Sequence, residues 1–124
     1  MRLVSRSWLL AILCWSGCKA DAPSSVEITK RAWHAHELVI RAGENAKTCA
    51  DAGATMQVAF AANRQAFVDA MTLDGDKQRL AEAADYIESN DERYKLIEAR
   101  MQVLSDRCGE DPTVAAAFRQ METP

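Results

Sequence analysis

A helical pattern of hydrophobic residues runs through residues 28–70, ITKRAWHAHELVIRAGENAKTCADAGATMQVAFAANRQAFVDA. Positions alternately four and three residues apart are hydrophobic throughout, except at Gly53 and Asn63. They are Ile28, Ala32, Ala35, Val39, Ala42, Ala46, Cys49, Gly53, Met56, Phe60, Asn63, Phe67 and Ala70. This spacing puts side chains on one face of an α-helix. A second run of the same kind extends from Leu80 to Cys108, so the sequence predicts long amphipathic helices.

The composition agrees with a single all-α domain. The chain has 124 residues, of which 48% are hydrophobic and 6% aromatic, with only 5 Gly and 3 Pro. Such a composition argues against a β-sandwich, a collagen-like repeat and a disordered chain. The formal net charge of −3 lacks the basic excess that phosphate binding requires, so we expect no nucleic-acid partner.

Capping residues mark the predicted ends of the helices. Ser24 begins a capping box of the S-x-x-E type, which starts the first helix. Gly75 and Asp76 are suited to a helix end followed by a new N-cap, so we expect the chain to fold back there. Asp111 and Pro112 have the residue types of an N-cap and a first helical position. The sequence therefore predicts a small up-and-down bundle of about four helices.

The first periodic run is too long for one helix of a compact domain. An unbroken helix over residues 24–72 would be about 70 Å long at 1.5 Å per residue. We therefore prefer a break within residues 43–53, with one helix ending near Cys49 and the next beginning near Asp51 or Ala52. A single long helix remains the alternative, because the spacing of hydrophobic residues is continuous across this region.

The N-terminus has the features of a secretory signal. Arg2 and Arg6 precede an apolar run over residues 8–15, which is too short to span a bilayer. Ser16 and Gly17 then stand directly before Cys18. This stretch resembles the lipobox of bacterial lipoprotein precursors, although Trp15 replaces the usual aliphatic residue.

The resemblance implies a lipid-anchored protein. Residues 1–17 would be a signal peptide, and Cys18 would carry a thioether-linked diacylglycerol and become the first residue of the mature chain. Residues 18–24 would then form the lipidated cysteine and its tether, and residues 25–122 a single helical-bundle domain. Lys19 stands where the family's inner-membrane retention signal is usually Asp, which favours the outer membrane, facing the periplasm. Ordinary cleavage after Ala20, giving a soluble secreted protein, is the alternative.

On this interpretation two of the four cysteines are free to pair. Cys14 leaves with the signal peptide and Cys18 carries the lipid, so we predict a disulfide between Cys49 and Cys108 in an oxidising compartment. A redox pair or a metal site would call for a motif such as C-x-x-C, which the sequence lacks. The bond is expected to join the end of the first helix to the end of the third.

This disulfide requires a bend in the third helix. Cys49 lies 26 residues before the turn at Gly75, whereas Cys108 lies 33 residues after it. The difference of seven residues corresponds to roughly 10 Å of helix. Straight antiparallel helices would therefore hold the two cysteines too far apart for a bond. We place the kink at Ser89–Glu92, which has the S-x-x-E pattern of a helix start.

The sequence offers few candidates for catalysis or metal binding. His34 and His36 are two residues apart, so on a helix they point about 200° apart and cannot share an ion. His34 and Glu37 could supply two ligands on one face, but the chain has no further His. We therefore predict no metal site, no cofactor and no catalytic residues, with His34 and Glu37 as weak metal candidates. The remaining large residues at helical spacing are predicted to be core: Met56, Phe60, Phe67, Met71, Met101 and Met121.

These features favour a non-enzymatic protein of the cell envelope. Nucleophile-elbow, phosphate-loop, dinucleotide-binding and zinc-protease motifs are missing from the sequence. We therefore expect a membrane-anchored helical bundle that binds or assembles another envelope protein. The main alternative is a small-ligand or metal-carrying bundle, and an envelope hydrolase is a third. A carrier needs an enclosed cavity with convergent polar groups, whereas a protein-binding bundle needs an exposed apolar surface.

Overall fold

The described part of the chain, residues 22–124 of a computed structural model, is an all-α bundle. Its elements are α2 (Ser25–Glu44), α3 (Cys49–Met71), the 3-10 helix η1 (Thr72–Gly75), α4 (Lys77–Ser89), α5 (Asp91–Cys108) and α6 (Pro112–Glu122). The predicted fold class is confirmed. The predicted signal peptide, Cys18 and most of the tether lie outside the described residues. Within residues 22–124, no helix combines the length and apolarity needed to cross a bilayer.

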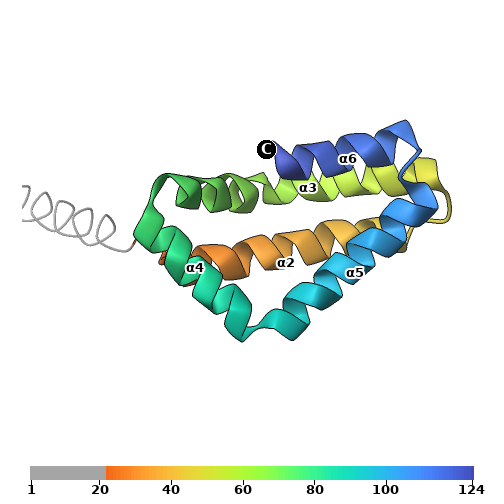
Figure 1. The fold of residues 1–124 in the computed structure, drawn as a ribbon. Helices are drawn as coiled ribbons and strands as arrows, with labels where there is room; N and C mark the ends of the chain where they lie inside the picture. Colours follow the sequence, from red (N-terminus) through yellow and green to blue (C-terminus); the bar gives the residue numbers. More distant parts are fainter. Residues whose placement is uncertain (1–21) are drawn as a thin grey trace, which may run out of the picture.

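α2, α3 and α6 lie along one axis, and α4 and α5 are inclined to it (Figure 1). α2 and α3 form an antiparallel pair, and α6 packs along α3. α4 and α5 together return the chain to the other end, and they meet at an angle, so that this third arm is bent away from α2 in the middle. The predicted up-and-down order with a kinked third helix therefore describes the fold, with the kink sharp enough to divide that helix into two.

Three of the predicted capping residues cap helices as expected. The side chain of Ser24 accepts a hydrogen bond from the backbone N–H of Glu27, and Asp76 accepts from two backbone N–H groups at the start of α4. Asp111 does the same for α6, with Pro112 in the first turn. Gly75 ends η1 without a positive φ, so its role in the turn does not depend on a left-handed conformation.

The break between the first two helices is confirmed, but its details differ from the prediction. α2 ends at Glu44, and α3 begins at Cys49 because Thr48, not a later residue, is the N-cap. Its hydroxyl accepts a hydrogen bond from the backbone N–H of Asp51 at 3.1 Å. Cys49 therefore opens α3 rather than closing the preceding helix, and the single long helix is wrong.

The kink lies where it was predicted, although not for the predicted reason. α4 ends at Ser89 and α5 begins at Asp91, with Asn90 between them. The hydroxyl of Ser89 donates to the carbonyl of Asp85, so it does not cap α5. The Asn90 side chain donates to the carbonyl of Tyr86 at 2.8 Å and closes the last turn of α4.

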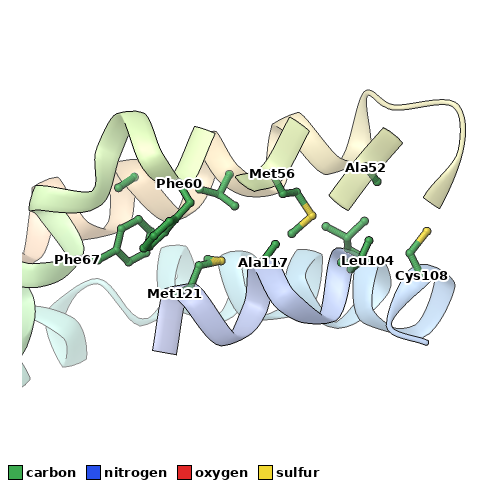
Figure 2. Packing of buried hydrophobic residues seen from close by; sticks show 11 residues of the cluster. Ala52, Met56, Phe60, Phe67, Leu104, Cys108, Ala117 and Met121 are labelled. Atoms are coloured by element: carbon green, nitrogen blue, oxygen red, sulfur yellow. The ribbon is translucent and has the colours of Figure 1, made fainter. Parts of the chain in front are cut away.

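The main core lies between α2, α3, α6 and the C-terminal half of α5 (Figure 2). Met56, Phe60 and Phe67 of α3 face Leu104 of α5 and Met121 of α6. Phe60 and Phe67 pack against each other with ring centroids 5.1 Å apart. Of the residues predicted to be core, Met101 is half-buried and packs against this cluster. Met71 is 49% exposed, so its prediction is wrong: it ends α3, where no helix covers its face.

Two glycines allow helices to approach closely at the end of the bundle that holds the cysteines. A Cβ on Gly53 of α3 would lie 2.5 Å from the backbone carbonyl carbon of Thr113 of α6. A Cβ on Gly43 of α2 would lie 2.8 Å from side-chain atoms of Leu104 and Met56. Both distances are too short for a side chain, so α2, α3, α5 and α6 converge here because these two positions lack one.

The predicted disulfide is present and closes this end. Cys49 and Cys108 are bonded, with their Cα atoms 5.3 Å apart. The bond joins the first residue of α3 to the last residue of α5, which corrects the expectation that it starts from the end of the first helix. Cys108 is also buried in the main core, so the bond continues the hydrophobic packing.

We predict that removing this bond lowers stability but not helix content. The cysteines are 59 residues apart, and closing a loop of that length restricts the unfolded chain by roughly 4 kcal/mol. The Cys49→Ser, Cys108→Ser double variant should therefore melt more than about 10 °C below the parent in thermal circular dichroism. Its far-ultraviolet spectrum at 20 °C should be unchanged, because the core residues remain. An unchanged melting temperature would contradict this account.

Candidate functional site

A groove separates α5 from α6 on one side of the bundle. The two helices diverge from the turn after Cys108, and the space between them has a volume of about 810 Å³. We call it the α5–α6 groove. It is lined by Lys95, Glu98, Ala99, Met101, Gln102, Ser105, Gly109, Ala115, Phe118, Arg119 and Glu122.

The groove has an apolar floor and a charged rim. Met101 and Phe118 are half-buried and pack against the main core, so they form the floor. Lys95 on α5 and Arg119 on α6 are exposed, as is Glu98, so charges of both signs line the rim. Because the rim is exposed, a bound molecule would keep one side in water. Enclosed sites for small ligands instead bury most of the ligand surface.

Each wall of the groove is fixed by its packing on a different helix. α6 packs on α3 through Val114, Ala117 and Met121, all of which are buried. α5 packs through Ile97 and Leu104, which belong to the core clusters that include residues of α2. The two walls therefore take their positions from different partners, and the disulfide fixes their common end.

Two ion pairs hold α5 against α2. Arg93 donates to the carboxylate of Glu37 at 3.0 Å, and Arg100 donates to Glu44 through two nitrogens. The two glutamates are seven residues apart on α2, and the two arginines are seven residues apart on α5. The two helices run in the same direction. The hydrogen bond from Arg100 lowers the pKa of Glu44 from its ordinary value, with smaller contributions from nearby cations. All four side chains remain partly exposed, so the two ion pairs contribute more to the alignment of α5 with α2 than to the stability of the fold.

The weak metal candidates do not come together with further ligands. His34 is exposed, and the carboxylate of Glu37 accepts the hydrogen bond from Arg93. His36 faces the core instead, with its ring 4.7 Å from that of Phe67. Among residues 22–124, no group of three or more His, Cys, Asp and Glu side chains is placed to hold a metal ion.

Sequence reasoning did not identify the groove or the ion pairs. Phe118 belongs to the apolar face of α6, of which Val114, Ala117 and Met121 pack on α3. One signal was available, since an apolar face that includes both Ala117 and Phe118 is wider than a single neighbouring helix covers. The ion pairs gave no local signal, because their partners are 56 residues apart.

We predict that His36 makes stability depend on pH. Burial lowers the pKa of His36 from its ordinary value, while its Nδ1 hydrogen bond to the Ala32 carbonyl opposes this shift. The folded pKa lies below the unfolded value of about 6.5. The unfolded chain therefore binds more protons in this window. The stabilisation is complete above about pH 6.5 and is lost as the pH falls through the folded pKa.

The measurement is the melting temperature between about pH 7.5 and pH 5, above the range where most carboxylates titrate. The parent should melt at a lower temperature as the pH falls, and His36→Gln should lose most of that dependence. His34→Gln is the control, because His34 is exposed, and it should behave as the parent does. An equal pH dependence in the parent and in His36→Gln would show that His36 is not the responsible group.

The α5–α6 groove thus has the features of a surface that can hold another molecule. It combines half-buried apolar residues, charges on both walls and access from solvent. In comparisons with protein-family models, with curated proteins and with solved structures, no match to this chain was found.

Proposed function

We propose that this protein is a lipid-anchored, non-enzymatic binding protein of the bacterial cell envelope, and that its α5–α6 groove holds a helical segment of a partner protein. The observation that carries the proposal is the groove itself, with Met101 and Phe118 on an apolar floor between charged rims. Grooves of this kind between helices accept the apolar face of an amphipathic helix.

The anchor is supported by the N-terminal sequence. Ser16, Gly17 and Cys18 follow a basic segment and a short apolar run, as in lipoprotein precursors. The disulfide fits the same location, because structural disulfides persist mainly in oxidising compartments such as the periplasm. Residues 19–24 could extend over at most roughly 20 Å, so an anchor on Cys18 would keep the helical domain close to the bilayer. Lys19 favours the outer membrane.

The choice of a protein partner is supported by the shape of the site. The principal alternative is a bundle that carries a small ligand or a metal ion. Such a carrier needs an enclosed cavity with convergent polar groups. The rim residues Gln102, Ser105 and Arg119 are instead exposed, which suits a long ligand that lies along the groove. An envelope hydrolase is the less favoured alternative.

The anchor is tested by metabolic labelling. Cells that produce the full chain are grown with radiolabelled palmitate, and we expect the label in the parent but not in Cys18→Ser. The variant should also move from the membrane fraction to the soluble fraction, because it loses its acyl chains. Cys14→Ser is the control and should keep the label. A Cys18→Ser variant that is still labelled and still in the membrane would contradict the anchor.

The groove is tested by site-specific photocrosslinking in intact cells. A photoreactive residue at Gln102, on the rim, should give a discrete adduct, whereas one at the exposed Gln65 of α3 should not. Adding Ser105→Trp should remove the Gln102 adduct, because the indole fills the groove. The matched Val58→Trp, on α3 outside the groove, should leave it. Equal adducts from Gln102 and Gln65, or an adduct unaffected by Ser105→Trp, would contradict a partner in the groove.

A further inference from the structure

The side of α4 that faces away from α2 is exposed and mostly apolar. The residues of α4 that contact α2 are Arg79, Glu82, Ala83 and Tyr86. Helical spacing puts four exposed residues on the opposite side, namely Lys77, Leu80, Ala81 and Ala84. Glu88, one turn further along, ends the apolar stretch. We call Lys77, Leu80, Ala81 and Ala84 the α4 outer face.

The fold makes little use of α4 as a core helix. Only Ala83 of its 13 residues is buried, whereas α6 buries three of its 11 residues. Leu80 is 44% exposed, so no described residue covers it fully. The outer face is therefore available to a neighbour outside the described chain.

The length of chain before Pro23 identifies that neighbour as the bilayer. Arg79 of α4 donates a hydrogen bond to the Pro23 carbonyl at 3.2 Å, so the start of the described chain touches α4 directly. Cys18 is five residues before Pro23, and five residues extend over at most about 18 Å. A helix with its side chains is roughly 10–12 Å across. A tether of this length can pass α4, but it cannot hold α4 far from the membrane.

The charges around the outer face do not select anionic lipids. Lys77 stands at its N-terminal end, while the nearby Asp74 and Asp85 are also exposed. The contact is therefore mainly apolar. Lys77 can extend its hydrocarbon stem over the apolar surface and keep its ammonium group among the headgroups.

We infer that α4 lies on the bilayer surface, with the α4 outer face at the boundary between headgroups and acyl chains. The inference rests on the proposed function, because it requires the acylated Cys18. One leucine and two alanines form a small contact, which is made because the anchor holds α4 at a high local concentration beside the lipid. The disulfide and the Gly109 end of the groove are at the opposite end of the bundle, and they stay in the aqueous space (Figure 1).

The test is fluorescence quenching with the purified, acylated full chain in phosphatidylcholine vesicles. A fluorophore is attached at Ala81→Cys, and a lipid nitroxide near the headgroups is the quencher. The native cysteines of the mature chain are acylated or bonded, so the added thiol is labelled selectively. The label should be strongly quenched at Ala81 and several-fold less at the matched Ala61→Cys, an exposed alanine of α3.

A second substitution tests the apolar contact itself. Leu80→Glu should reduce quenching of the Ala81 label several-fold, because a carboxylate opposes entry into the boundary region. Leu96→Glu is the matched control, since Leu96 is 60% exposed on α5, and it should leave the quenching unchanged. All the substituted side chains are exposed, so the fold should be retained, as circular dichroism would show.

Two results would overturn the inference while the anchor stands. One is equal quenching at Ala81 and Ala61 in protein that floats with the vesicles, and the other is quenching at Ala81 that Leu80→Glu does not change. A parent chain that takes up no palmitate and does not float would overturn the anchor, and the inference with it. The Gln102 adduct reports on the groove in every case.

Discussion

The bond between Cys49 and Cys108 sets the geometry on which the other features depend. It fixes the first residue of α3 next to the last residue of α5, with 5.3 Å between their Cα atoms. Because the return arm from the turn at Gly75 has more residues than α3, a straight helix would overshoot this point. The arm is instead bent at Asn90, and the extra length is taken up by the angle between α4 and α5 (Figure 1).

The bend leaves α4 with few buried side chains, and polar contacts partly compensate for this loss of packing. α4 buries only Ala83 completely, and it is held to the start of α2 by the hydroxyl of Ser25, which donates to Glu82. Beyond the bend, Trp33 of α2 lies between Tyr86 and Tyr94, with ring centroids 5.4 and 6.1 Å away. This aromatic cluster connects α2 to both α4 and α5 on the inner side of the bend, and the Arg93 guanidinium lies over the Trp33 ring.

Much of the fold could be predicted because it depends on local patterns and on chain length. The spacing of apolar residues predicts the helices, and Ser24, Asp76 and Asp111 predict where three of them begin. The kink followed from counting residues between the turn and the two cysteines. Thr48 was not predicted as the N-cap of α3, because the sequence pattern placed the start of this helix near Asp51 or Ala52. Only the structure shows that the Thr48 hydroxyl accepts a hydrogen bond from the backbone N–H of Asp51.

The candidate surfaces could not be predicted in the same way, because they depend on the angles between helices. The residues of the groove are ordinary for amphipathic helices, and the groove exists because α6 follows α3 while α5 follows α2. The ion pairs between Arg93 and Glu37 and between Arg100 and Glu44 depend on the alignment of helices far apart in sequence. That alignment is set by the packing of the core, and it cannot be read from a local sequence pattern.

α5 therefore has three faces with different consequences for function. Ile97 and Leu104 attach it to the core, the side with Gln102 and Ser105 borders the groove, and the side with Leu96 and Val103 remains uncovered. The bend at Asn90 and the disulfide at Cys108 are what keep this helix in place.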